Sequence, residues 1–167
     1  MELDVAAARK QIGESFTFTA EETVEPQQYA GRTIRFAAPL QVQGAYVFDG
    51  KDFTLTAEAR TVLDETCARC GKAFQRPYEF SVSERFTKSL AQDDPEESYS
   101  YMGDRMDISK AVMDNFYLHL PLVSLCREDC KGLCPVCGAN LNETQCTCQP
   151  TEAKNPFSVL ASLSDKE

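Results

Sequence analysis

The chain has 167 residues, of which 43% are hydrophobic and 26% are charged. This length and composition are typical of one globular domain, with or without a small additional lobe, and they exclude a disordered polypeptide. The formal net charge of −9 disfavours diffuse attraction to phosphate backbones or anionic lipid. The composition therefore argues against a general polyanion-binding protein.

The sequence shows no sign of export or membrane insertion. Residues 1–16 lack a basic flank followed by an apolar run, and no window approaches the roughly 18 apolar residues of a membrane span. We therefore expect a cytoplasmic protein that makes no membrane contact. Thiols stay reduced in that compartment, so paired cysteines there indicate metal binding rather than disulfides.

The N-terminal region predicts two short elements. Asp4 is a good helix N-cap and Gly13 a good C-terminal stop, which favours a helix over residues 5–12. Residues 15–20 alternate between apolar and polar side chains, a pattern that predicts a half-buried strand.

The strongest β signal begins at residue 40. Apolar side chains alternate over residues 40–48, stop at the hairpin-turn sequence of residues 49–52 and alternate again over 53–62. A third alternating run covers residues 74–86. These runs predict an antiparallel meander of three long strands, forming a curved sheet or a partial barrel.

The region after the meander changes character. Residues 91–106 are rich in Asp and Glu and contain Pro95 and Gly103, which is typical of a solvated acidic linker. A helix is then expected from Asp107 or Ser109 to the residue before Pro121, with one face on the sheet.

Two further features lie in the C-terminal half of the chain. His119 is the single histidine, and its place near the end of the expected helix favours a surface or helix-terminus role over metal binding or base catalysis. Residues 155–163 begin with an Asn-Pro pair and predict a short terminal helix.

We therefore predict an α+β fold: an antiparallel β meander or partial barrel with a packed helix and a small C-terminal zinc-binding lobe. We expect the regions to form one domain overall. In order they are the β-rich region 1–90, the acidic linker 91–106, the helix and connector 107–125, the cysteine-rich lobe 126–150 and the tail 151–167.

Eight cysteines carry the clearest chemical signal. They are Cys67, Cys70, Cys126, Cys130, Cys134, Cys137, Cys146 and Cys148. Zinc in structural sites takes four soft ligands at tetrahedral corners, and a Cys-x-x-Cys-Gly turn supplies two of them as thiolates. The glycine is favoured because that turn needs a positive φ. Eight thiolates predict two structural zinc ions, and at least one.

The spacing leaves the division of these ligands open. One partition places the last four cysteines on one ion and joins the CARCG pair to Cys126 and Cys130 on the other. A second partition places both CxxCG turns on one ion, and a third binds one zinc and leaves free thiols. Loop closure favours the first partition, because its C-terminal site is local.

Closed four-cysteine sites predict no chemistry at the metal, because no coordination position remains for water or substrate. The chain also lacks a Gly-rich phosphate loop, GxSxG and HExxH. We therefore expect a protein that is not an enzyme and has no small-molecule substrate. The competing hypothesis is a thiol-disulfide oxidoreductase or redox switch using CARC or CPVC, although no thioredoxin-like βαβ pattern surrounds either pair.

A local contact with RNA has a few candidate residues around the first cysteine pair. Arg69, Lys72 and Arg76 are interleaved with Phe74 and Tyr78, which is a pattern that RNA-binding surfaces use. A solvated hairpin flank is the simpler interpretation of the same residues.

The cysteine motifs and their surroundings resemble one known family. CARCG at a strand end, LHLPLVSLC running into CREDCKGLCPVCGANLNETQCTC, and NPFSVLASL near the C-terminus are similar to the bacterial YceD family. The resemblance implies a non-enzymatic role in the accumulation of large-subunit ribosomal RNA, with no catalytic residue to carry over.

The partner implied by that family is a ribosomal protein or a pre-ribosomal particle. An acidic chain engages a basic ribosomal protein more easily than RNA, because charge complementarity steers the encounter. A protein-interaction adaptor unrelated to ribosomes is the remaining alternative.

Overall fold

A computed structural model describes residues 1–88 and 99–148. The chain divides into two compact units. Met1–Glu65 and Ala73–Ser124 form the first, called the β unit here, and Thr66–Lys72 and Leu125–Glu167 form the second, called the cysteine unit.

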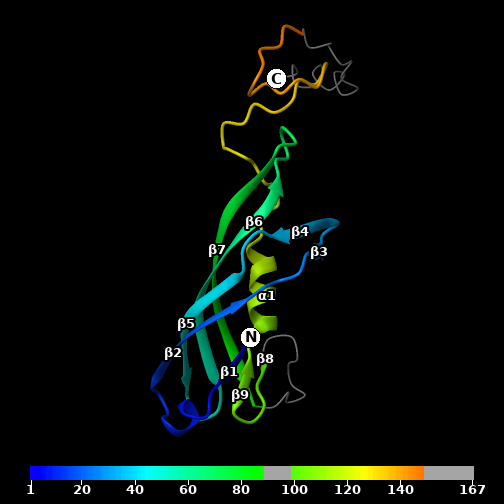
Figure 1. The fold of residues 1–167 in the computed structure, drawn as a ribbon. Coiled ribbons are helices and arrows are strands. Elements are labelled where there is room, and N and C mark those ends of the chain that lie inside the picture. The colour runs from blue at the N-terminus through cyan, green and yellow to red at the C-terminus, as the bar shows by residue number, and fades with distance from the viewer. Residues whose placement is uncertain (89–98, 149–167) are drawn as a thin grey trace, which may run out of the picture. The chain divides into compact units, whose positions relative to one another are not determined.

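The described residues hold nine strands, one short 3-10 helix and one α-helix (Figure 1). In chain order they are β1 Glu2–Asp4, η1 Ala8–Lys10, β2 Ser15–Glu22, β3 Gln27–Tyr29, β4 Arg32–Phe36, β5 Leu40–Phe48, β6 Phe53–Thr66, β7 Ala73–Thr87, β8 Tyr99–Ser100, β9 Arg105–Asp107 and α1 Ser109–His119.

The main sheet is open and largely antiparallel. Strand β5 pairs with β2 on one side and with β6 on the other, and β7 pairs with the opposite side of β6. Strand β4 continues along β6 beyond β5, with β3 outside it, and the short β8 runs parallel to β7. The open sheet agrees with the predicted meander and is not closed into a barrel.

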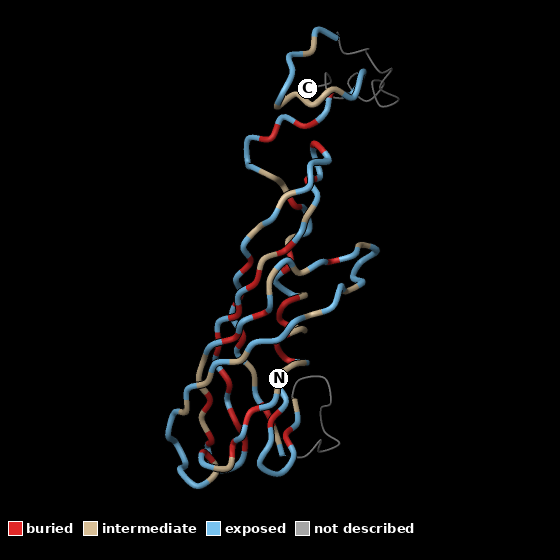
Figure 2. Tube along the Cα trace, in the orientation of Figure 1, coloured by how far each residue is buried: buried red, intermediate tan, exposed pale blue. Residues whose placement is uncertain are grey.

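Alternating burial explains why these segments are strands. Successive residues of β6 are buried and exposed in turn over most of its length, so one face meets the core and the other meets solvent (Figure 2). The buried face carries residues such as Phe53, Leu55 and Leu63. The period-two pattern in the sequence is this alternation.

Helix α1 covers part of the buried face and lies beside β7 (Figure 1). The Phe116 ring of this helix packs among three aromatic rings of the sheet. Its centroid lies 5.1 Å from that of Phe36, 5.4 Å from that of Tyr78 and 5.8 Å from that of Phe80. The Tyr78 hydroxyl also donates to the backbone oxygen of Phe116 at 3.3 Å. One aromatic side chain thus joins the helix to the sheet.

A second group of aromatic side chains packs around Phe53, at the start of β6. Phe53 packs against Phe48 at 4.8 Å and against Tyr101 at 4.9 Å. Strands β1 and β9 form a separate two-stranded ladder, and the Tyr46 hydroxyl donates to the Asp4 backbone oxygen at 3.0 Å. This ladder therefore connects to the main sheet through a buried tyrosine.

The structure confirms the predicted long strands and the helix before Pro121. The helix expected over residues 5–12 is wrong, because only η1 forms there. The Asp4 carboxylate accepts from the Ala6 amide at 2.9 Å, which makes a tight turn instead of a cap. Ile108 is the N-cap of α1, while Asp107 accepts from the Ser109 amide at 2.9 Å.

Several short strands were not predicted. Strands β1, β3, β8 and β9 have two or three residues each, too few to show a period in the sequence. Strands β8 and β9 lie in the region around the expected acidic linker, of which residues 91–98 are outside the described part. The terminal helix expected at residues 155–163 also lies outside it. Among the described residues, no helix is both long enough and apolar enough to cross a membrane.

Candidate metal centres

The cysteine sulfurs gather in two groups of four, both within the cysteine unit. In each group all ligand atoms lie within 4.8 Å of one another. The first group is Cys67, Cys70, Cys126 and Cys130, and the second group is Cys134, Cys137, Cys146 and Cys148. This is the partition that loop closure favoured.

The CARCG turn is built by backbone hydrogen bonds that fold the chain around a sulfur pair. The Cys67 amide donates to the Lys72 oxygen at 2.9 Å, and the Gly71 amide donates to the Cys67 oxygen at 2.9 Å. Gly71 has a φ of 71°, a conformation that side chains disfavour. The predicted need for glycine after the second cysteine is confirmed.

The CPVCG turn repeats the same pattern. The Cys134 amide donates to the Ala139 oxygen at 2.8 Å, the Gly138 amide donates to the Cys134 oxygen at 2.9 Å, and Gly138 has a φ of 72°. The amide of Val136 also points at the Cys134 sulfur at 3.4 Å. The CPVCG turn thus directs a backbone N–H group at one of its own sulfurs, an arrangement that favours a thiolate.

The sulfur spacing of the first group fits a tetrahedral ion. Cys67 and Cys130 sulfurs are 3.8 Å apart, and Cys70 and Cys126 sulfurs are 3.7 Å apart. Zinc–sulfur bonds of about 2.3 Å place neighbouring sulfurs about 3.8 Å apart. A disulfide needs about 2.05 Å. Cys67, Cys70 and Cys130 are also buried.

The sulfurs of the second group are similarly spaced, but its cysteines are more exposed to solvent than those of the first group. The sulfur of Cys146 is 3.5 Å from that of Cys137 and 3.5 Å from that of Cys134. Only Cys134 is buried, whereas Cys137 and Cys148 are exposed. The two groups therefore offer the same ligands in different surroundings.

Protonation of the first group is divided between its members. Hydrogen bonding from the Cys126 backbone lowers the pKa of the Cys67 thiol to about 6. Burial, together with the neighbouring sulfurs, raises the pKa of the Cys126 thiol to about 12. The Cys67 thiol therefore ionises readily, whereas the Cys126 thiol resists a negative charge.

The second group shows the same division. Backbone hydrogen bonds from Cys137 and Val136 lower the pKa of the Cys134 thiol to about 6. Contact with Cys146 and Cys137 raises the pKa of the Cys148 thiol to about 12. A divalent cation held by the four sulfurs would offset this mutual repulsion and favour the ionised form of all four. Spacing and donor chemistry together fit zinc at both groups.

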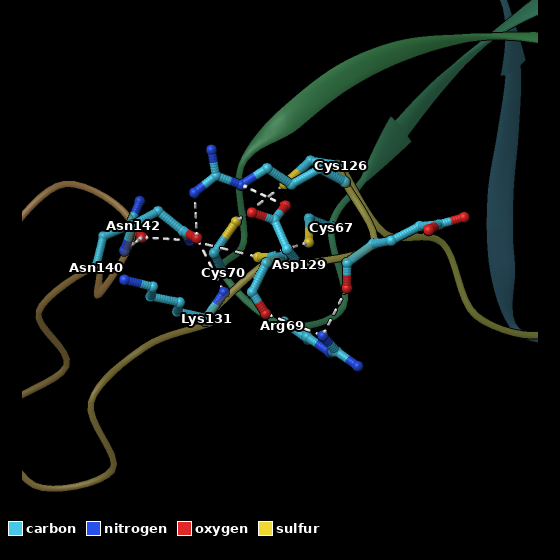
Figure 3. A network of polar contacts seen from close by, with 11 residues as sticks. Cys67, Arg69, Cys70, Cys126, Asp129, Lys131, Asn140 and Asn142 are labelled. Atoms are coloured by element: carbon cyan, nitrogen blue, oxygen red, sulfur yellow. Dashed lines mark hydrogen bonds and ion pairs between the residues drawn. The ribbon is translucent and has the colours of Figure 1, made fainter.

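Further contacts hold the two segments of the first group together (Figure 3). The Arg69 guanidinium donates to the backbone oxygens of Glu128 at 3.2 Å and Cys130 at 3.0 Å. Gly132, with a φ of 75°, passes so close to the Arg69 backbone that a Cβ there would lie 3.1 Å from its oxygen. Hydrogen bonds and close packing thus hold together, at the first group, two segments that are far apart in the sequence.

The residues suggested for RNA contact are mostly engaged within the protein. Arg69 is used as just described, Arg76 pairs with Glu65 at 3.2 Å, and Tyr78 is buried. Lys72 is exposed. His119 is exposed at the end of α1, and its Nδ1 lies 2.8 Å from the Asn115 backbone oxygen, which matches the expected helix-terminus role.

The sequence did not predict the contact of Asn142 with the first group. Asn142 belongs to the segment between Cys137 and Cys146, yet its side-chain Nδ2 lies 3.4 Å from the sulfur of Cys130 in the first group. Ligand spacing identifies cysteines alone, so the sequence pattern held no signal for this contact.

The model of a protein family described as large ribosomal RNA subunit accumulation protein YceD matches residues 55–164. The chain belongs to the YceD family. The matched range contains β7, α1 and both cysteine groups. The family resemblance expected from the cysteine motifs is confirmed.

Curated relatives of this chain include plant and mycobacterial proteins. A chloroplastic large ribosomal RNA subunit accumulation protein YCED homolog 1 of Arabidopsis thaliana is 26% identical, over 77% of this chain and 49% of the relative. Its Zea mays counterpart is 52% identical over 27% of this chain and 16% of the relative. An uncharacterized Mycobacterium tuberculosis protein is 31% identical, over 57% of this chain and 47% of its own.

The matches thus span about half the length of these curated relatives, or less. No solved structure gives a significant match to the chain.

Proposed function

We propose that this protein is a non-enzymatic ribosome-biogenesis factor that supports accumulation of large-subunit ribosomal RNA in the cytoplasm. Membership of the YceD family, over a range that includes both cysteine groups, is the observation that carries the proposal. The family and its plant relatives are described as large ribosomal RNA subunit accumulation proteins, which supports a role connected with the ribosome.

Two zinc ions would act as structural braces of the cysteine unit. The first group would hold one ion and the second group the other, each through four thiolates. Bound zinc supplies cross-links between chain segments, and a closed set of four ligands leaves no position for a substrate. The surface formed around the two braced turns would then be the binding surface.

Charge supports a basic protein as the direct partner. Acidic and basic side chains are equal in number in the cysteine unit, so the whole formal charge of −9 belongs to the β unit. Each four-thiolate zinc site adds two negative charges to the cysteine unit. Such a molecule attracts a basic ribosomal protein, alone or on a pre-ribosomal particle, and repels bare RNA.

The role is tested in cells that lack this protein. We expect a lowered ratio of large-subunit to small-subunit ribosomal RNA, restored by the wild-type chain and not by a Cys67→Ser, Cys70→Ser variant. The matched control is Ser81→Ala, an exposed strand position of the β unit. An unchanged ratio in the depleted cells contradicts the proposal.

The partner is tested with purified protein. We expect capture of one or more basic ribosomal proteins and co-sedimentation with pre-ribosomal particles, with weak retention of a large-subunit RNA fragment in filter binding. Tight RNA binding that falls steeply with salt would show instead that RNA is the direct partner.

The redox hypothesis makes the opposite prediction for the same cysteines. Zinc-bound sulfurs should resist alkylation until a chelator is added, and two zinc ions per chain should be measured. Turnover in a disulfide-reduction assay by metal-free protein, with no bound zinc in reduced preparations, would favour an oxidoreductase.

A further inference from the structure

Asn142 physically connects the two cysteine groups. It lies in the segment between Cys137 and Cys146, whose sulfurs belong to the second group, and its side chain reaches Cys130 of the first group. A residue of one site therefore contacts a ligand of the other. Figure 3 shows Asn142 beside the cysteines of the first group.

The orientation of the Asn142 amide is fixed by its partners. Its Oδ1 accepts from the Lys131 backbone amide at 2.9 Å and from the Arg127 guanidinium at 2.7 Å. Both partners are donors only, so the oxygen must face them and Nδ2 must face the sulfur. An N–H donor to a coordinated thiolate stabilises its charged form.

The segment that carries Asn142 is itself held near the first group. The Leu141 amide donates to the Gly132 oxygen at 2.9 Å, and the side chain of Asn140 accepts from both nitrogens of Asn142, at 3.1 Å and 2.8 Å. Leu133 and Asn140 form a β-bridge. These bonds place Asn142 only while the loop between Cys137 and Cys146 keeps this shape.

Metal at the second group fixes that loop at both ends. Tying Cys137 and Cys146 to one ion removes most of the freedom of the eight residues between them. The Asn142 donor is then already in place when the first group binds its ion. By thermodynamic reciprocity, metal at the first group equally favours metal at the second.

We propose that Asn142 is a positioning residue that couples the two cysteine groups, so that metal bound by the second group raises the metal affinity of the first. This inference rests on the zinc binding proposed above. The two sites are then energetically coupled, so that neither binds metal independently of the other.

The experiment uses full-length protein at a series of buffered free-zinc concentrations. Protection of Cys67 and Cys130 from alkylation, read by mass spectrometry, gives the zinc concentration at which the first group is half filled. The second group is disabled by Cys137→Ser with Cys148→Ser. In protein that keeps the wild-type Asn142, this change should raise the zinc concentration at which the first group is half filled about 10-fold.

The same change should have less than about a twofold effect in the Asn142→Ala background, where the coupling contact is already absent. Asn142→Asp keeps the oxygen that accepts from Lys131 and Arg127 but replaces the donor with a carboxylate. We expect it to weaken the first group at least as much as Asn142→Ala, which separates loss of the donor from loss of loop packing.

Gln145→Ala is the matched control, because Gln145 is exposed in the same loop. It should leave half-filling unchanged. Equal half-filling of the first group with and without an intact second group would overturn the coupling while leaving zinc binding intact. Alkylation of Cys67 and Cys130 at every zinc concentration would overturn the proposed metal site itself, and the coupling with it.

Discussion

The hydroxyl of Ser124 donates a 2.7 Å hydrogen bond to Oε1 of Glu65. Each of these residues stands two positions before a cysteine of the first group, Cys67 or Cys126. Glu65 also pairs with Arg76 on β7, at 3.2 Å between its Oε2 and the arginine Nε. The bond therefore fixes, within the β unit, the two chain segments that lead to the first group.

Ser124→Ala should lower the free energy of unfolding by about 1–3 kcal/mol, because it removes a donor from a largely buried carboxylate. Urea unfolding of the zinc-loaded protein, followed by tyrosine fluorescence, measures the change. The exposed Ser81→Ala provides the comparison. A loss no larger than that of Ser81→Ala would mean that water replaces the hydroxyl.

Gly44 lets strands β5 and β6 approach closely. It lies opposite Ala57, and a Cβ at Gly44 would be 2.5 Å from the Ala57 Cβ and would also meet the Thr56 backbone oxygen. Gly44→Ala should therefore cost about 1–3 kcal/mol of unfolding free energy, since backbone must move to make room. Gln43→Ala, exposed on the same strand, should change stability by less than about 0.5 kcal/mol.

The ion pair of Asp52 and Arg85 should contribute more than an exposed pair on the same sheet. Arg85 Nε donates to Asp52 Oδ2 at 3.0 Å, and the Asp52 side chain is only 5% exposed. Asp52→Ala should cost about 1.5–3 kcal/mol. Glu79→Ala, which breaks an exposed pair with Arg60, should cost less than about 1 kcal/mol. Equal effects in thermal unfolding would contradict this ranking.

The long elements were predictable because burial repeats along them. Every second residue of β6 faces the core, and the sequence shows the same period over residues 53–62. The positive φ of Gly71 and Gly138 was predictable for a different reason, since the Cys-x-x-Cys-Gly turn leaves few other conformations. Both features are predictable because each depends on residues that are close together in the sequence.

The remaining features depend on partners far apart in the chain. Strand β1 forms only because Glu2–Asp4 meets β9 about a hundred residues later, and three residues show no period of their own. In the sequence Asn142 looks like an ordinary turn residue. Its contact with Cys130 arises only when the folded loop comes close to that cysteine. Such contacts are set by the assembled fold, so a single sequence does not display them.

The turn between β5 and β6 should contribute a pH-dependent part of stability. The backbone amides of Asp52 and Lys51 donate to the Asp49 carboxylate at 2.7 Å and 2.8 Å, and they hold the pKa of this carboxyl below its usual value. A lowered folded pKa means that the contribution is complete above the unfolded pKa of about 3.9 and is lost as the pH falls through the folded value.

An NMR titration of the side-chain carboxyl carbons should place the midpoint of Asp49 below that of a model aspartate. Asp49→Asn should make the acid limb of the stability profile shallower. A midpoint at or above the model value would show that the two amides do not favour the charged form in solution.

Chelator should remove metal from the second group before the first. Cys137 and Cys148 are exposed, whereas Cys67 and Cys130 are only 2% and 3% exposed, so a competing ligand reaches the second group more easily. Alkylation mapped by mass spectrometry over time should modify Cys137 and Cys148 first in the zinc-loaded wild-type protein. Simultaneous modification of all eight cysteines, or earlier modification of Cys67, would mean that burial does not control release and that both sites open in one step.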